Sequence, residues 1–389
     1  MQEKELKILE VLDCYYPKFD GPCLVITSYS NSMLKMKDTI VKVAVPKFPK
    51  YKDNQKFTVF RTKSIPSAEG YRCALPGLDS KLKRFLKENE FDIIHIHSPF
   101  TMCAYFTKYG KKHNIPTIFT FHTKYRDDFE RDLKLKCLQN FMMKYILKNM
   151  NRADHVWTVS DGAKECLREY GYKKPIKVIR NGTDLVYPDN AEKLIDKINE
   201  KYGFDKDETV FLSVGRIVEN KNLQLALSAL KMVAEDGFRF KYMIVGSGNY
   251  ENELKESVEK YGLRDQVIFT GKILDREELS AHYLRSDLFI FPSTFDTASL
   301  APIEAAAMKL PTLMNEGCAT AEIIENNING YLAEETTVAW ANRIEEIIKN
   351  KDKLKKMKDA AYKGVYRTWD SVAEEVVENY KEIVKNHKK

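Results

Sequence analysis

Residues 287–308, DLFIFPSTFDTASLAPIEAAAM, predict a buried strand that runs through a loop into a helix. Four apolar residues follow Asp287, and Pro292 ends the strand because proline cannot donate to a sheet. The loop carries Asp296, and a helix is expected over residues 300–308. A buried apolar strand that leads directly into a helix is the unit of a parallel α/β sheet.

The start of this helix has the features of an anion-binding site. Ser299 is expected as its N-cap, with Leu300 next to it and Pro302 tolerated in the first turn. Helix N-termini offer unpaired N–H groups and partial positive charge to phosphates. Asp296 and Glu304, eight residues apart, could accept hydrogen bonds from sugar hydroxyls. The pattern suits a nucleotide-sugar, although an ordinary strand, loop and helix with solvated acids would look the same.

Length and composition indicate a soluble protein of two domains. The chain has 389 residues, of which 43% are hydrophobic and 31% charged. No run approaches the roughly 20 apolar residues of a membrane span. The N-terminus leads directly into a predicted strand, so no signal peptide is expected. The seven scattered cysteines, without a C-x-x-C pair, indicate reduced thiols in the cytoplasm.

Positive charge is concentrated in the first half of the chain. Residues 1–190 contain 34 Lys and Arg against 22 Asp and Glu, whereas the remainder contains 29 against 34. This asymmetry indicates an anionic partner for the first half only. Nothing resembles a nucleic-acid module, so a membrane surface fits better than nucleic acid.

Short apolar strands alternate with helical patterns in both halves, which predicts two doubly wound parallel sheets. We expect an N-terminal domain over residues 1–186, a second over 187–367 and a final helix over 368–389 that packs back on the first. Capping boxes are predicted to begin helices after Asp275 and Ser371. The clearest strands are residues 8–12, 93–97, 117–121, 156–159, 176–179, 210–214, 242–245, 267–270, 288–291 and 312–314.

Two cations follow the strand over 210–214. Arg216 comes after a glycine, and Lys221 lies just before the next predicted helix. Ligands of open α/β sheets sit outside the carboxyl ends of the strands, so both side chains could reach a diphosphate. Gly246-Ser-Gly248 after another strand is a weak signal, because glycines there often only allow a tight turn.

His122 ends the strand over 117–121 and could point into a cleft between the domains. A single histidine at a strand end is more often structural, and His97 is interpreted as a buried or supporting residue. Neither lies beside a Ser or Cys in a pattern typical of a nucleophilic triad. No Asp-x-Asp follows a strand, so no catalytic metal is expected.

A basic amphipathic helix is predicted within residues 131–152. Leu135, Leu138, Met142 and Ile146 would share one face, and lysines lie elsewhere around it. Such a helix can lie in a membrane interface, where each Lys or Arg gains about 1 kcal/mol from anionic lipid. The alternative is a surface helix that packs one side onto its own sheet.

The chain resembles the retaining GT-B glycosyltransferases of family 4, and among them the bacterial 1,2-diacylglycerol 3-glucosyltransferases. The resemblance covers nearly the whole chain and rests on several blocks together. These are Tyr15-Tyr-Pro17 with Asp20-Gly21, Ile65-Pro66, Tyr71-Arg-Cys-Ala-Leu-Pro76, His95-Ile-His-Ser-Pro99, His122-Thr-Lys-Tyr125, Val159-Ser-Asp161, Arg180-Asn-Gly-Thr-Asp184 and Gly215-Arg216 through Lys221-Asn222.

The resemblance implies how a sugar-nucleotide is bound. Arg216 and Lys221 would hold the diphosphate, Glu304 the ribose, and Asp296 and His122 the sugar. The remaining implied contacts come from Gly21, from the backbone of Lys272 and Ile273 at the base, and from Ser299 and Leu300 at the phosphates. Two positions depart from the family pattern, since Asp296 replaces a glutamate and Ser299 a glycine.

The implied activity is transfer of a hexose, expected to be glucose from UDP-glucose, to a membrane lipid such as diacylglycerol, with retention of configuration. No metal and no cofactor besides the donor are implied, and the enzyme would be cytoplasmic and peripheral on the inner face of the membrane. Three alternatives remain open: a cell-wall or polysaccharide acceptor, a nucleotide-sugar epimerase or hydrolase, and a two-lobed sugar-binding receptor.

Overall fold

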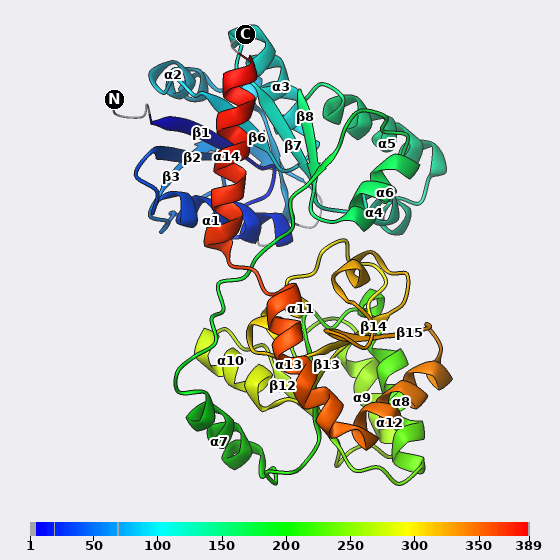
Figure 1. Cartoon of the computed structure of the whole chain (residues 1–389). Coiled ribbons are helices and arrows are strands. Elements are labelled where there is room, and N and C mark those ends of the chain that lie inside the picture. Colours follow the sequence, from blue (N-terminus) through cyan, green and yellow to red (C-terminus); the bar gives the residue numbers. More distant parts are fainter. Residues whose placement is uncertain (1–4, 19, 68–69, 388–389) are drawn as a thin grey trace. The chain divides into compact units, whose positions relative to one another are not determined.

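The computed structural model describes residues 5–18, 20–67 and 70–387. It divides into two compact units, which are coloured along the chain in Figure 1. Unit 1 comprises Met1–Asn181 and Trp369–Lys389, and unit 2 comprises Gly182–Thr368. The first boundary therefore lies five residues before the predicted one at 186/187. Each unit contains a parallel sheet with helices, so the predicted α/β class with two Rossmann-like domains is confirmed.

Unit 1 contains a seven-stranded parallel sheet in the order β3-β2-β1-β6-β7-β8-β9. Its central strands are buried on both faces, as parallel strands under helices are. A two-stranded antiparallel ribbon, β4-β5, accompanies it. The strands are β1 Leu6–Val11, β2 Thr39–Pro46, β3 Thr58–Thr62, β4 Ser64–Pro66, β5 Arg72–Ala74, β6 Ile93–Ile96, β7 Thr117–Phe121, β8 His155–Thr158 and β9 Lys177–Val178.

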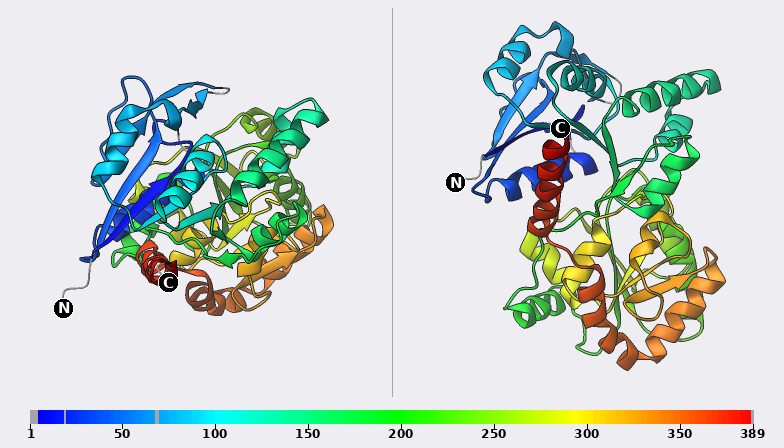
Figure 2. Two further views of the ribbon diagram at one scale, coloured as in Figure 1. Left: turned by 90° about the horizontal axis from the view of Figure 1, so that it is seen from above. Right: turned by 45° about the horizontal axis from the view of Figure 1, so that its top comes forward.

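The last helix of the chain, α14, belongs to unit 1 and runs beside α1, as Figures 1 and 2 show. The rings of Tyr29 and Trp369 pack edge to face at 5.8 Å, and Lys35 forms a 2.7 Å ion pair with Asp370. The helices of unit 1 are α1 Gly21–Met33, α2 Ser80–Glu88, α3 Thr101–His113, α4 Tyr125–Asp132, α5 Lys136–Met150, α6 Asp161–Glu169 and α14 Trp369–His387.

Unit 2 contains a six-stranded parallel sheet in the order β12-β11-β10-β13-β14-β15. Two hydrophobic clusters belong to this unit: Trp340 and Leu230 belong to one, Tyr283 and Leu194 to the other. The elements are α7 Ala191–Tyr202, β10 Val210–Val214, α8 Leu223–Glu235, β11 Lys241–Val245, α9 Glu251–Lys260, β12 Val267–Gly271, α10 Arg276–Arg285, β13 Leu288–Phe291, α11 Ala301–Ala307, β14 Thr312–Asn315, β15 Gly330–Ala333, α12 Thr337–Lys349 and α13 Lys351–Val365.

Each sheet has one place where the direction of strand addition reverses. In unit 1 the chain builds outward from β1 through β2 and β3, then returns to the other side of β1 with β6. In unit 2 it builds outward from β10 through β11 and β12 and returns to β13. In doubly wound proteins the loops that follow such strands diverge and leave a crevice, which is where ligands bind.

Three strands have the predicted bounds, β7, β10 and β13, and the other predicted strands differ by one or two residues at their ends. The strands that the apolar pattern did not single out include β2, which lies inside the unit 1 sheet, and β3 and β15, which lie at sheet edges. An edge strand is less buried, and β3 runs from exposed to buried along its length. The apolar signal is correspondingly weaker there.

One predicted helix start is confirmed and one is wrong. Asp275 caps α10 and accepts a 2.7 Å hydrogen bond from the N–H of Glu278. By contrast, α14 already begins at Trp369, so Ser371 lies inside its first turn and does not cap it. Packing of Trp369 against α1 extends this helix beyond the capping-box signal.

The basic helix predicted within residues 131–152 is α5, with Leu135 as its N-cap, and the first two residues of the segment belong to the end of α4. The buried apolar residues of α5 are Met143, Ile146 and Met150. The buried face therefore shares only Ile146 with the predicted one. Across the described residues, the helices are all too short or too polar to cross a membrane.

Candidate functional site

The residues predicted to hold a diphosphate lie at the reversal point of the unit 2 sheet. Lys221 ends a short 3₁₀ turn after β10, and Asp296 lies in the loop after the neighbouring strand β13. Nζ of Lys221 is 2.7 Å from both carboxylate oxygens of Asp296. The fold thus joins two predicted site residues from distant parts of the sequence.

This ion pair still has hydrogen-bonding capacity. The Lys221 ammonium has three N–H donors, and two of them point at Asp296. A carboxylate offers about four lone-pair directions, of which Lys221 occupies two. The two side chains are 19% and 18% exposed. Lys221 and Asp296 can therefore each bind a polar group of a ligand while the ion pair between them stays intact.

A hollow opens beside the pair at the end of β10. It is lined by Ser213, Gly215, Arg216, Lys221 and Pro292, among others. Arg216 is exposed, so its guanidinium is available to solvent beside the more buried Lys221. Two cations at the rim of one largely apolar hollow make a favourable place for a polyanion.

Close backbone packing fixes the loop that carries Arg216. The loop after β11 lies directly against it: the N–H of Gly215 donates to the carbonyl of Val245 at 3.0 Å. A Cβ on Gly246 would lie 1.8 Å from the carbonyl oxygen of Gly215, and one on Gly248 would lie 1.9 Å from that of Ile217. The glycines of the weak Gly246-Ser-Gly248 signal therefore allow two loops to meet.

The helix after β13 starts later than predicted. It spans Ala301–Ala307, and its N-cap is Leu300, without a side-chain cap. Ser299 as N-cap is therefore wrong, because the chain enters the helix one residue further on. Pro302 lies in the first turn as expected and contributes no N–H. The predicted phosphate contacts of Ser299 and Leu300 stay a prediction.

Glu304 on α11 is nearly buried and held by two donors. One carboxylate oxygen accepts from Nη2 of Arg276 at 2.9 Å, and the other accepts from the Tyr283 hydroxyl at 3.0 Å. Arg276 also pairs with Asp184. Burial would lower the pKa of Arg276, but the two carboxylates outweigh it and raise that pKa. The Glu304 carboxylate is thus fixed in orientation, and about two of its lone-pair directions remain available for a ligand.

The remaining predicted ligand contacts lie at strand or helix ends. Lys272 and Ile273 follow β12 directly after Gly271, which adopts φ +74°. Lys272 is exposed, and Ile273 packs partly onto the unit 2 core. In unit 1, Gly21 is the first residue of α1 and lies beside open space, because an added Cβ would meet nothing within 4 Å.

His122 lies directly after β7 in unit 1 and is buried. Its Nε2 is 2.9 Å from Nδ1 of His97, and Nε2 of His97 is 2.7 Å from Glu10 Oε2. Burial lowers the pKa of His97 to about 3 and holds the pKa of His122 well below its usual range. Both rings are therefore neutral at neutral pH, and His97 and Glu10 share a hydrogen bond rather than an ion pair.

Glu10 belongs to the same buried network and was missed by the sequence analysis. It is fully buried in β1, and burial raises its pKa to about 8, although a hydrogen bond from Tyr380 opposes the rise. The Tyr380 hydroxyl on α14 lies 3.0 Å from Glu10 Oε1 and 2.5 Å from His95 Nδ1. The available signal was a glutamate in the middle of an apolar strand, since unpaired acids are rarely buried.

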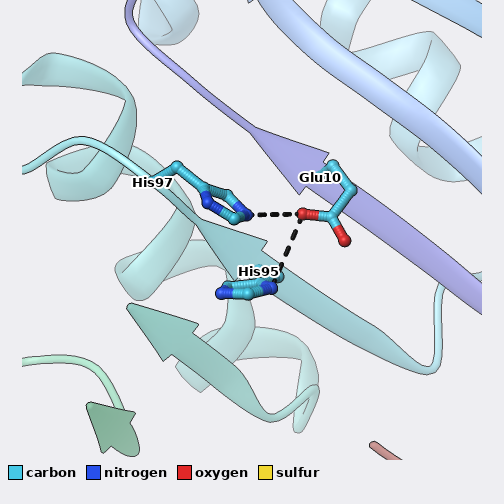
Figure 3. A group of neighbouring side chains, drawn as sticks. All are labelled: Glu10, His95 and His97. Atoms are coloured by element: carbon cyan, nitrogen blue, oxygen red, sulfur yellow. Dashed lines mark hydrogen bonds and ion pairs between the residues drawn. The ribbon is translucent and has the colours of Figure 1, made fainter. Parts of the chain in front are cut away.

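Glu10, His95 and His97 bring their donor atoms within 4.8 Å of one another, as Figure 3 shows. Ligands around a zinc ion at about 2.0–2.2 Å would be roughly 3.4 Å apart in a tetrahedral site. The 2.7 Å between His97 and Glu10 is instead a hydrogen-bond length, and His95 Nδ1 already meets Tyr380. The geometry favours a hydrogen-bonded network over a metal site.

Two family models match the chain. The model described as Glycosyltransferase Family 4 matches residues 33–187, and Glycosyl transferases group 1 matches residues 194–364. Together they cover most of the sequence, one in the first half and one in the second.

Similar proteins agree with these matches. An alpha-monoglucosyldiacylglycerol synthase of Streptococcus pneumoniae is 27% identical over 328 residues, which is 82% of this chain and 73% of the relative. One of the same name from Acholeplasma laidlawii is 22% identical over 355 residues, covering 87% and 85% of the two chains. The crystal structure of Anabaena Alr3699/HepE in complex with UDP has a TM-score of 0.76 at 17% identity, covering 97% of this chain and all of that one.

The family resemblance inferred from the sequence blocks is thereby confirmed, and the protein belongs to the family 4 and group 1 glycosyltransferases as an enzyme of the GT-B fold.

Proposed function

We propose that the protein transfers glucose from UDP-glucose to a diacylglycerol-type lipid at an anionic membrane surface, with retention of configuration and without a metal. The observation that carries the transfer chemistry is the Lys221–Asp296 pair beside Arg216 at the end of β10. The lipid acceptor is supported by the relatives whose names describe monoglucosyldiacylglycerol synthases. The proposed enzyme acts as a peripheral protein on the cytoplasmic face of the membrane.

In the proposed reaction, the bond between the anomeric carbon and the diphosphate breaks while an acceptor hydroxyl attacks from the same face. The hydroxyl proton leaves with the diphosphate, and the departing oxygen takes the electron pair. Lys221 and Arg216 stabilise the negative charge that grows on the diphosphate. This fixed positive charge supplies what a divalent cation would otherwise contribute, which supports a metal-independent mechanism.

The carboxylates and the histidine hold the donor. Asp296 keeps two lone-pair directions beyond those used by Lys221, and it accepts from hydroxyls of the sugar. Glu304, oriented by Arg276 and Tyr283, accepts from the ribose hydroxyls. His122 contacts the sugar, and the backbone at Lys272 and Ile273 meets the base. Asp296 is one methylene shorter than glutamate, and pairing with Lys221 keeps its carboxylate in a fixed position.

The beginning of α5 supports contact with a membrane. Leu135, Leu138 and Phe141 are 63%, 41% and 62% exposed. Four lysines lie on or just before this helix, at positions 134, 136, 144 and 148. Exposed apolar side chains on a helix that also carries several lysines suit the boundary between headgroups and acyl chains of an anionic leaflet.

Replacing Leu138 and Phe141 with serine is expected to weaken binding to anionic vesicles about tenfold or more for each side chain, and so about a hundredfold or more together. Full burial of such a side chain is worth about 1.5–3 kcal/mol, and about 1.4 kcal/mol corresponds to a factor of ten. Vesicle co-sedimentation at low salt measures the effect. Val338→Ser, at a 55% exposed position on α12, is the matched control. Equal binding by all variants would remove α5 from the membrane contact.

The donor and acceptor are tested together with purified protein. Vesicles containing diacylglycerol are incubated with UDP-glucose, UDP-galactose or GDP-mannose, and the lipid products are separated. We expect an α-linked monoglucosyl lipid from UDP-glucose alone. Transfer only to oligosaccharides would instead favour a cell-wall or polysaccharide acceptor, and rapid conversion of the donor without acceptor would favour an epimerase or hydrolase.

A further inference from the structure

We propose that Glu10 and His97 are positioning residues that set which ring nitrogen of His122 carries the proton. The inference rests on the proposed function insofar as His122 contacts the donor sugar, but the proton arrangement itself can be measured without substrate. None of the sequence blocks that define the family resemblance includes Glu10.

The relay consists of two hydrogen bonds in series. Glu10 Oε2 meets Nε2 of His97, and Nδ1 of the same ring meets Nε2 of His122. A neutral imidazole has one N–H and one bare nitrogen, so His97 must donate in one of these bonds and accept in the other. The direction of both bonds is therefore decided together.

The other side of Glu10 decides where its proton resides. The Tyr380 hydroxyl donates to Glu10 Oε1 and accepts from Nδ1 of His95, whose Nε2 lies 2.6 Å from the Thr120 hydroxyl. Because Oε1 is the acceptor in this arrangement, a proton on the carboxyl group lies on Oε2 and faces His97. Every member of the network keeps its hydrogen bonds whether Glu10 is ionised or protonated.

Each state of Glu10 gives one tautomer of His122. When Glu10 is protonated, Oε2 donates to His97, His97 Nδ1 donates to His122 Nε2, and the His122 proton is on Nδ1. When Glu10 is ionised, His97 donates to Glu10, His122 Nε2 donates to His97, and His122 Nδ1 carries no proton. The relay of Glu10, His97 and His122 carries three protons in the first state and two in the second. His122 thus changes from hydrogen-bond donor to acceptor at Nδ1.

The surroundings of Glu10 determine the pH of this change. The titratable side chains that contact Glu10 are His95 on β6, His97 after β6 and Tyr380 on α14; Tyr29 on α1 packs against the two histidine rings, and His122 is one step further along the relay. Within the described part of the chain, no lysine or arginine pairs with Glu10. Burial without a cation places its ionisation at about pH 8.

The test is the tautomer of His122 in protein labelled with ¹⁵N-histidine, read from long-range ¹H–¹⁵N spectra between pH 6 and pH 10. In the wild-type protein we expect the proton to be on Nδ1 at low pH and on Nε2 at high pH, with a midpoint near 8. A merely structural role for Glu10 and His97 would leave one tautomer at every pH, and that result would overturn the relay.

Two conservative variants sharpen the test. Glu10→Gln accepts from Tyr380 through its oxygen and donates to His97 through its amide, so His122 should keep the proton on Nδ1 throughout. Tyr380→Phe removes a bond that lowers the pKa of Glu10, so the change should move to higher pH. A fully folded Glu10→Gln protein in which the His122 tautomer still changes with pH as in the wild type would contradict the proposal.

Activity separates this inference from the proposed function. For UDP-glucose, the pH profile of kcat should inflect near pH 8 in the wild type and lose that inflection in Glu10→Gln. A pH-dependent tautomer of His122 without any sugar transfer would contradict the proposed function and support the relay. Sugar transfer with a pH-independent tautomer would support the proposed function and contradict the relay.

Discussion

Lys221→Ala is expected to lower kcat for sugar transfer by about a hundredfold or more. Lys221 is the less exposed of the two cations beside the hollow at the end of β10, and its Nζ is held in place by Asp296. Loss of one preorganised donor to a developing oxyanion typically costs about 2.7–4 kcal/mol in the transition state. Steady-state kinetics with UDP-glucose and lipid acceptor measure the loss.

The same substitution also releases Asp296, so a control must separate charge stabilisation from disturbance of the loop. Lys309→Ala breaks a comparable 2.9 Å ion pair with Asp359 elsewhere in unit 2 and should leave kcat nearly unchanged. Lys221→Arg keeps the positive charge and should retain part of the activity. Near-normal turnover in Lys221→Ala, with unchanged secondary structure by circular dichroism, would remove this residue from the mechanism.

Gly248→Ala is expected to destabilise unit 2 by about 3 kcal/mol and to abolish most donor binding. The new Cβ would lie 1.9 Å from the carbonyl oxygen of Ile217, and backbone cannot rotate away as a side chain can. Overpacking of this kind costs about 1–3 kcal/mol, and disruption of the loop hydrogen bonds adds to it. Because Arg216 lies on the loop that must move, the diphosphate site would be distorted as well.

Chemical denaturation and a thermal-shift titration with UDP measure the two effects. Gly262→Ala is the matched control, since Gly262 has φ +68° but an added Cβ would meet nothing within 4 Å. It should cost only about 1 kcal/mol and leave UDP binding unchanged. Gly248→Ala protein that binds UDP as tightly as the wild type would show that the contact between the two loops does not position Arg216.

The repeated alternation of buried strand and helix was readable from the sequence, because strands covered on both faces must be apolar throughout. That is why β7, β10 and β13 have the predicted bounds. The edge strand β3 carried less signal because it runs from exposed to buried along its length. Helix starts were less predictable: Asp275 caps α10, but α11 is capped by Leu300 rather than Ser299, and α14 begins at Trp369, before Ser371.

Candidate site residues could be named from the sequence wherever a polar side chain follows a strand, as Arg216, Lys221 and Asp296 do. Their roles in donor binding remain predictions. The sequence could not show that Lys221 and Asp296 pair, since partners on different loops meet only through the strand order. It also gave no reason to connect Glu10 with Tyr380, which lie 370 positions apart.

The amino-acid sequence by itself determined the class of fold and the family, because periodic burial and short loop motifs are local properties of the chain. Only the tertiary structure decided which charged groups meet, which glycines allow two loops to pack closely and which acid lies buried beside His97. Those properties depend on distances between segments far apart in sequence, and such distances are set by the order of strands in each sheet and by the packing of α14 against α1.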